Sequence, residues 1–196
     1  FDNPYFILHE NTNSFDRDRL FGNVSASYQV NEDLKVVVRT GLDNSAELRE
    51  FKRAFSSNRF RNGAYAEHDV RFREQNTDIL IDYNKDLMDL KWGIAVGANR
   101  MEQRASTRQF QTLSLAQPGI FSLNNAASPI EAFEFVGRKN INSIYALAKL
   151  SYKDFLFVDL TARNDWSSAL ATPTSTANTS FFYPSVSAAF ILNRVV

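Results

Sequence analysis

Histidine, cysteine and acidic side chains carry most catalytic and metal-binding chemistry, and here they form no recognisable arrangement. The sequence has two histidines, His9 and His68, and no cysteine. The histidines lack the spacing of metal ligands, so we interpret each as an ordinary polar side chain. The absence of cysteine removes disulfides, thiolate metal sites and cysteine nucleophiles. The sequence therefore predicts no catalytic centre, no metal site and no cofactor, and we expect that the protein is not an enzyme.

One stretch, residues 49–65, interleaves aromatic residues with arginines. Such residues anchor many interfaces, through large buried areas and forked hydrogen bonds. They could also bind nucleic acid, but acidic neighbours and an overall balance of 22 basic and 22 acidic residues argue against it. We expect an external loop here that contacts a partner protein or a substrate; the alternative is that the long loops only pack on one another. The candidate contact residues are Phe51, Arg53, Phe55, Phe60, Arg61 and Tyr65.

The elements that would position this loop are strands, because polar and apolar residues alternate with period two. In the first clear example, Val24, Ala26 and Tyr28 share one side while Ser25 and Ser27 share the other. The same pattern predicts about seven strands, over residues 23–30, 34–43, 76–83, 90–99, 144–152, 156–165 and 185–192. Gly93 and Gly97 alternate on one of these strands, so we interpret them as space for a plug or for neighbouring side chains rather than as a phosphate loop.

Short and long connections alternate between the expected strands. The short turns lie near residues 31–33, 84–89 and 153–154, and the long aperiodic stretches cover residues 44–69, 103–140 and 167–180. Outer-membrane barrels place their short turns at one end and their long loops at the other, which soluble sandwiches seldom do. Aromatic residues near strand ends fit interfacial girdles: Tyr28, Tyr83, Trp92, Tyr152 and Trp166.

The faces of the strands follow from the same alternation. We predict that one set of residues faces lipid: Val24, Ala26, Val36, Val38, Ile94, Val96, Ala148, Val158 and Leu160. A second set is predicted to face the lumen: Ser25, Ser27, Arg39, Asp159 and Arg163. No apolar run approaches the roughly 18 residues that a spanning helix needs, and the mean hydropathy is −0.32. The predicted fold is all-β: an antiparallel transmembrane β-barrel section with short periplasmic turns and long extracellular loops.

Both ends of the sequence influence the domain assignment. The first residues show no basic and apolar signal-peptide pattern, and the last residues interrupt an alternating run. We therefore expect residues 1–196 to be a partial barrel domain, cut from the middle of a longer chain that supplies the signal peptide, a plug and the remaining strands.

Three segments, in matching order, resemble the SusC/RagA family of TonB-linked outer-membrane proteins. The first contains Asn3-Pro4-Tyr5-Phe6, then Asn13, and then Arg19-Leu20-Phe21-Gly22-Asn23-Val24. The second is Val158-Asp159-Leu160-Thr161-Ala162-Arg163-Asn164-Asp165-Trp166-Ser167-Ser168, and the third is Phe182-Tyr183-Pro184-Ser185-Val186-Ser187. We expect all three to lie on strands or where strands begin, so they indicate the family and say nothing of the substrate.

The resemblance implies a barrel of twenty-two strands filled by an N-terminal plug, in the outer membrane of a Gram-negative bacterium of the Bacteroidetes type. It implies active import of glycan oligosaccharides or peptides, driven through the TonB complex, which contacts N-terminal parts outside this sequence. It also implies a SusD-like surface lipoprotein that closes the barrel as a lid.

Two other functions are compatible with the residue pattern. A soluble carbohydrate-binding β-sandwich would use loop aromatics to stack on sugars, and detergent-dependent solubility would distinguish a barrel from it. A passive porin-like or adhesin barrel would have the same strands without energy coupling, and an upstream plug would distinguish the transporter from it.

Overall fold

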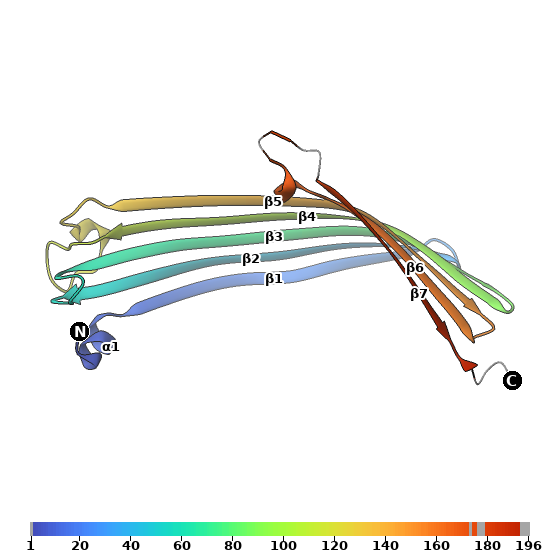
Figure 1. The fold of residues 1–196 in the computed structure, drawn as a ribbon, viewed down its shortest axis with the longest axis horizontal. Coiled ribbons are helices and arrows are strands. Elements are labelled where there is room, and N and C mark those ends of the chain that lie inside the picture. The colour runs from blue at the N-terminus through green and yellow to red at the C-terminus, as the bar shows by residue number, and fades with distance from the viewer. Residues whose placement is uncertain (1, 173, 176–178, 193–196) are drawn as a thin grey trace. The chain divides into compact units, whose positions relative to one another are not determined.

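Seven strands in a single sheet dominate the computed structural model, which describes residues 2–172, 174–175 and 179–192. The strands are paired in chain order from β1 to β7, so each consecutive pair is an antiparallel hairpin (Figure 1). The elements are α1 (Pro4–Glu10), β1 (Asn13–Gln29), β2 (Leu34–Phe55), β3 (Asn62–Leu87), β4 (Leu90–Thr112), η1 (Leu123–Asn125), β5 (Glu131–Tyr152), β6 (Leu156–Ser167), η2 (Ser168–Leu170) and β7 (Ser180–Phe190). The predicted all-β class and strand number are confirmed.

The connections alternate in length as predicted, but two of the long loops were placed wrongly. Residues 30–33, 88–89 and 153–155 form the short turns, and residues 56–61, 113–130 and 168–179 form the connections at the opposite strand ends. Most of residues 44–69 and 103–140, expected as loops, belongs to β2, β3, β4 and β5. In the third expected loop, residues 173 and 176–178 lie outside the described residues.

These strand segments carry polar residues on both faces, which explains why the alternation of polar and apolar residues did not predict them. On β2 beyond Leu42, one face carries Asn44, Glu50 and Lys52, and the other carries Glu47 and Arg49. Hydropathy alternates only where one face meets an apolar environment. The backbone hydrogen bonds continue without that contrast, so the strands run on where the pattern ends.

The chain divides into two compact units. The first unit contains the residues up to Leu20, Asp43–Arg73 and Arg104–Gly137, and the second contains Phe21–Leu42, Glu74–Gln103 and the residues from Arg138 onward. The predicted strands with clear alternation belong to the second unit, and the polar strand segments belong to the first.

The second unit shows the predicted division into two faces. Leu150 pairs with Val158, which pairs with Ala188, and every residue of this row is apolar. One position along, Lys149 pairs with Asp159, which pairs with Ser187. Because residues paired across an antiparallel ladder share a face, one side of β5–β7 is apolar and the other is polar.

The apolar side is exposed rather than packed into a core. Val24, Ile94 and Val186 are 71%, 45% and 72% exposed. Among the described residues, the buried apolar side chains are Ala54, Ala64, Tyr65 and Leu115, all in the first unit. No second sheet faces the first in the described part of the chain. The β-sandwich alternative is therefore wrong.

Aromatic residues gather near the short turns of the second unit. The rings of Tyr83 and Trp92 lie 5.4 Å apart, and Phe155 contacts both Tyr152 at 5.6 Å and Phe190 at 5.3 Å. On β6, the outward side chains extend from Leu156 near this aromatic group to Trp166. Ten residues of strand cover about 33 Å, which the usual barrel tilt of about 40° reduces to about 25 Å. That height matches the apolar band of an outer-membrane barrel.

The Asn3-Pro4-Tyr5-Phe6 motif forms a helix and not the strand region that we expected. Asn3 is the N-cap of α1, and its side chain accepts a hydrogen bond from the Tyr5 backbone N–H at 2.9 Å. Asparagine at the N-cap followed by proline at the first helical position is a strong helix-start signal, which explains the difference. No helix in the described residues has the length and apolar character needed to cross a membrane.

Candidate functional site

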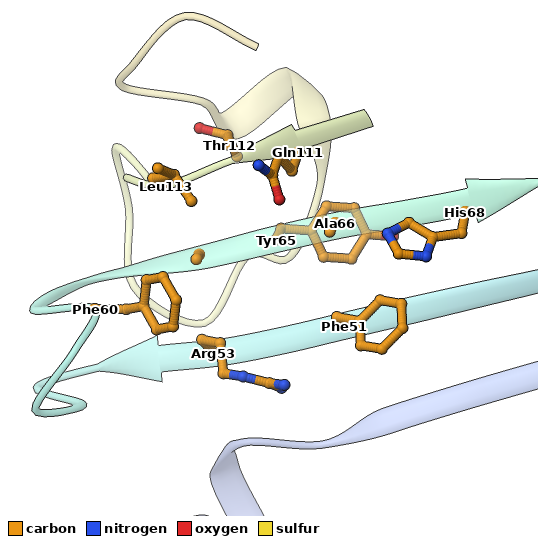
Figure 2. A pocket seen from close by; sticks show the side chains of 10 residues that line it. Phe51, Arg53, Phe60, Tyr65, Ala66, His68, Gln111, Thr112 and Leu113 are labelled. Carbon is orange, nitrogen blue, oxygen red and sulfur yellow. The ribbon is translucent and has the colours of Figure 1, made fainter. Parts of the chain in front are cut away.

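A pocket of about 240 Å³ lies in the first unit, where the β2–β3 hairpin meets the end of β4 (Figure 2). Figure 2 shows Phe51 and Arg53 coming from β2, His68 from β3 and Gln111 from β4. The full lining is Phe51, Arg53, Phe60, Ala64, Tyr65, Ala66, His68, Gln111, Thr112 and Leu113. Four of the six contact residues predicted from the sequence therefore come together around one cavity.

The remaining two predicted residues, Phe55 and Arg61, make contacts within the β2–β3 hairpin and do not line the pocket. Phe55 packs against Gly63, where a Cβ atom would lie 3.1 Å from its ring. Gly63 has a φ of 68°, a conformation that favours glycine. Arg61 is exposed, and its backbone carbonyl accepts a hydrogen bond from the Ser56 N–H at 2.9 Å.

Arg53 lines the pocket, yet its guanidinium is already used within the unit. It donates to the Asn13 side chain at 2.8 Å and to the Lys52 carbonyl at 2.7 Å. The bond to Asn13 connects β2 to β1, and the two bonds together fix the side chain. Arg53 therefore forms part of the pocket wall, and its guanidinium is already hydrogen-bonded within the protein.

Tyr65 is 3% exposed, and its hydroxyl lies between two carboxylates. It is 2.6 Å from Glu50 Oε1 and 2.8 Å from Glu67 Oε1, and its single proton can be donated to one of them at a time. Burial and these hydrogen bonds raise the pKa of Tyr65 far above its usual value, while the bond from Tyr65 lowers the pKa of Glu50. Tyr65 is thus a neutral connector of β2 and β3 and not the exposed contact that its sequence position suggested.

His68, which we interpreted as an ordinary polar residue, forms part of the pocket with Phe51. The two rings have centroids 4.6 Å apart and are tilted by 48°. Burial, and secondarily the charge of Arg49, lowers the pKa of His68. The ring is therefore neutral at pH 7 and provides a mainly aromatic wall with one polar nitrogen.

Residues at the end of β4 and at the start of the β4–β5 connection complete the pocket, and sequence reasoning missed them. Gln111 and Leu113 lie more than forty positions from His68 in the chain, so only the pairing of β3 with β4 brings them near. The connection is ordered by Asn125, which accepts from the Gln117 N–H at 3.1 Å and donates to the Gln117 and Ile120 carbonyls. A frequent signal for such a loop is an asparagine bonding to nearby backbone, as here.

The N-terminal segment holds the tip of the β2–β3 hairpin. Asp2 accepts hydrogen bonds from the Ser57 hydroxyl at 3.0 Å and the Asn58 N–H at 2.8 Å. Asn11 accepts from the Ala54 N–H at 2.9 Å and donates to Ser57 at 3.2 Å. The two sides of α1 are thus fastened to the hairpin, and the pocket wall is pre-organised.

A second polar group crosses the inward face of the second unit. Arg39 on β2 forms an ion pair with Asp78 on β3, with 2.6 Å between Nη2 and Oδ1. The Tyr145 hydroxyl on β5 donates to the other oxygen of Asp78 at 2.5 Å. Arg163 on β6 stacks over the Tyr145 ring, with Cζ 6.0 Å from the centroid, and donates to Asp165 at 2.7 Å. We call Arg39, Asp78, Tyr145, Arg163 and Asp165 the inward ladder.

Gly97 lets Tyr145 reach Asp78 across β4. A Cβ atom at Gly97 would overlap the Tyr145 ring and hydroxyl, and Gly97 itself is buried beneath that side chain. A Cβ atom at Gly93 would likewise overlap the side chain of Asn84. The prediction that these glycines make room for neighbouring side chains is confirmed.

The chemistry available at both places is recognition by hydrogen bonds and stacking. The inward ladder borders a groove of about 430 Å³ with two guanidiniums, two carboxylates and a phenol. Among residues 2–172, 174–175 and 179–192, no cluster of His, Asp or Glu could hold a metal ion. The groove suits a polar chain with many donors and acceptors.

Comparison with solved structures shows the architecture to which this sheet corresponds. The RagAB peptide importer in its closed-closed state superposes with a TM-score of 0.84 over 95% of this chain, at 16% identity. The structure described as the RagAB peptide transporter gives 0.80, with the same coverage and identity. The siderophore receptor PiuA from Acinetobacter baumannii gives 0.55 over 91% of this chain and 29% of its own, at 12% identity.

The fold is that of a TonB-dependent transporter barrel. The resemblance to the SusC/RagA family is thereby confirmed in the fold. The chain spans only 21% of the RagAB chains that it matches, so it corresponds to a section of their sheet. No protein-family profile and no curated protein sequence matches it.

Proposed function

We propose that this chain is a section of the barrel of a TonB-dependent outer-membrane transporter, which imports peptides or glycan oligosaccharides with a SusD-like surface lipoprotein. The observation that carries the proposal is the exposed apolar face of the second unit, backed by a polar inward face. An apolar face of this extent would be unstable in water, whereas lipid covers it at no cost in hydration. The inward ladder provides the polar lining that a hydrophilic solute needs. The fold of the RagAB peptide importer supports peptides as the substrate class, and glycans remain the alternative.

In this proposal the polar strand segments of the first unit lie outside the cell. Both faces of these segments are polar, which suits water and excludes the hydrocarbon region. The pocket around Phe51 and Phe60 would then contact the lid or the substrate. Its aromatic walls, neutral histidine and Gln111 amide suit an apolar side chain beside a backbone amide.

Energy-coupled uptake tests the function. Cells producing the full-length protein, given fluorescently labelled oligopeptides and oligosaccharides, should accumulate one class and lose that accumulation when a protonophore collapses the proton motive force. A passive porin would equilibrate the solute regardless of the protonophore, and that result would contradict the transporter assignment.

The same assay tests the pocket with the variant Phe60→Ala. Deleting the whole hairpin end is unsuitable, because Tyr65 and Ala64 are buried there. An aromatic residue that anchors an interface contributes about 2 kcal/mol to the binding free energy. Removing the Phe60 ring should therefore weaken binding of the lid by about tenfold or more, if the pocket contacts the lid. If the pocket contacts the substrate, the substrate concentration for half-maximal uptake should rise by the same factor.

Arg61→Ala is the matched control, since Arg61 is the next residue in the same turn and does not line the pocket. Co-purification of the lid distinguishes the two roles: weakened lid binding assigns the pocket to the lid, and weakened uptake with the lid bound assigns it to the substrate. Wild-type values of both for Phe60→Ala would refute the proposed role of the pocket.

A further inference from the structure

Two arginines of the first unit share one buried carboxylate. Glu47 on β2 is 6% exposed, and its Oε2 atom accepts a hydrogen bond from Nε of Arg17 on β1 at 2.6 Å. Its Oε1 atom accepts from Nε of Arg49, two positions further along β2. We call Arg17, Glu47 and Arg49 the arginine triad. Charge-assisted bonds to a buried carboxylate hold both guanidiniums in fixed positions.

The triad keeps spare hydrogen-bond donors and a spare positive charge. Glu47 is contacted by Nε and Nη2 of Arg17 and by Nε of Arg49. In the described part of the chain, the other guanidinium nitrogens of both arginines have no protein partner. The side chains of Arg17 and Arg49 are 51% and 44% exposed, so a ligand can reach them. Two guanidiniums against one carboxylate leave a single net positive charge.

The neighbouring carboxylates do not compensate this charge. Asp43, the next acidic residue on the same side of β2, is paired with Arg19 at 2.7 Å. Asp16 and Asp18 precede and follow Arg17 in the sequence, but successive residues of a strand point to opposite faces. The face of β1 and β2 that carries the triad is therefore locally positive.

The triad adjoins the pocket that Phe51 and His68 line. Arg49 and Phe51 are two positions apart on β2, so their side chains leave the same face about 7 Å apart. The Phe51 ring lies beside the His68 ring, with 4.6 Å between centroids (Figure 2). Burial lowers the pKa of His68, and the positive charge of Arg49 lowers it further. The Arg49 guanidinium is thus close to this end of the pocket.

The pocket lining favours an apolar side chain. Phe51, Phe60 and Leu113 present carbon to the cavity. A sugar ring would bury hydroxyl groups against these side chains without hydrogen-bond partners, which is costly. The Gln111 amide donates to Glu131 at 2.5 Å, so its oxygen is left to accept from a peptide N–H. The pocket therefore suits one apolar residue of a peptide.

We propose that the arginine triad binds a carboxylate of a peptide whose apolar side chain, two positions away, occupies the pocket. Alternate side chains of an extended peptide also lie about 7 Å apart on one side, as Arg49 and Phe51 do. A carboxylate matches the single positive charge of the triad, whereas a phosphate carries about two negative charges. This inference rests on the proposed function, because the peptide would be the imported solute, and it assigns the pocket to the substrate.

Fluorescence anisotropy with the full-length protein in detergent tests the site. The first labelled peptide has blocked ends, one phenylalanine and a glutamate two positions later. In the second, glutamine replaces the glutamate, and in the third, serine replaces the phenylalanine. The fourth has no acidic side chain but a free C-terminal carboxylate two positions after the phenylalanine. Comparing the first and fourth peptides distinguishes an acidic side chain from a chain terminus as the source of the carboxylate.

The wild-type protein should bind the tighter of the two carboxylate peptides at least about tenfold better than the glutamine or the serine peptide, because bonds to charged groups are worth about that factor. Arg49→Gln and Arg17→Gln should each lower the preference for carboxylate over glutamine by about tenfold. Neither should change the affinity for the glutamine peptide, which a general loss of structure would reduce. Each variant leaves Glu47 one arginine, so either can replace the other if one is poorly produced.

Arg61→Gln is the charge-matched control, because Arg61 is an exposed arginine of the first unit that belongs to neither the triad nor the pocket lining. It should keep the wild-type preference. Equal affinities for the carboxylate and glutamine peptides, a preference that survives in both triad variants, or a preference lost in Arg61→Gln would overturn the proposal. Protonophore-sensitive uptake alongside any of these results would show that the triad assignment fails and the transporter function stands.

Discussion

Leu160→Arg in the full-length protein is expected to lower the free energy of unfolding by about 2–4 kcal/mol, the cost of arginine near the middle of a lipid-facing barrel strand. Leu160 lies midway along the outward side of β6, pairs with Ala148 and Val186, and is 45% exposed. In lipid a guanidinium loses its hydration at this depth. Denaturant unfolding in lipid vesicles would measure the change.

Thr161→Arg is the matched control for this prediction. Thr161 is the next residue of β6 and pairs with Leu147 and Ser185 on the inward face. There the guanidinium can remain hydrated, so we expect a loss below about 1 kcal/mol. Equal losses at the two positions would show that the faces are not lipid and lumen.

Gly97→Leu is expected to destabilise the protein by about 2.5–6 kcal/mol. The new side chain would occupy the space that Tyr145 uses to cross β4. Overpacking of this kind costs about 1–3 kcal/mol, and displacing Tyr145 from Asp78 costs a further 1.5–3 kcal/mol for a bond to a charged group. The loss would appear as a lower denaturant midpoint.

A double-mutant cycle separates the clash from other effects of replacing this glycine. In a Tyr145→Ala background the ring is gone, so Gly97→Leu should cost at least about 1 kcal/mol less than in the wild type. Additive losses would mean that Gly97 and Tyr145 do not interact, and would remove the basis for the inward ladder.

The strands of the second unit could be predicted from the sequence because their two faces differ in hydropathy. The strand segments of the first unit could not, because both of their faces are polar. A different period-two signal was present there. Oppositely charged residues two positions apart pair on the same face: Glu47 with Arg49, Glu50 with Lys52 and Asp69 with Arg71 in the first unit. Arg100 and Glu102 do the same on β4, in the part of that strand that belongs to the second unit. Period two in the sign of charge would have extended β2, β3 and β4 correctly.

The candidate site was only partly predictable for a different reason. Phe51 and Phe60 could be found from the local density of aromatic residues, and they do line the pocket. Gln111 and Leu113 are brought to the pocket by the pairing of β3 with β4, which joins residues far apart in the sequence. Local composition does not encode that pairing. The buried position of Tyr65 was also hidden, because it depends on two carboxylates from neighbouring strands meeting one hydroxyl.

Accessibility of spin labels along β6 tests the central claim, that the second unit presents one face to lipid and the other to water. These 196 residues contain no cysteine, so single cysteines at positions 157–162 can be labelled in the full-length protein once any cysteine outside these residues has been replaced. Oxygen concentrates in the hydrocarbon, and a water-soluble nickel chelate is excluded from it. The account predicts that oxygen broadening peaks at Val158, Leu160 and Ala162 and nickel broadening at Asp159 and Thr161, with period two. Equal broadening at consecutive positions, or a nickel maximum at Leu160, would contradict it.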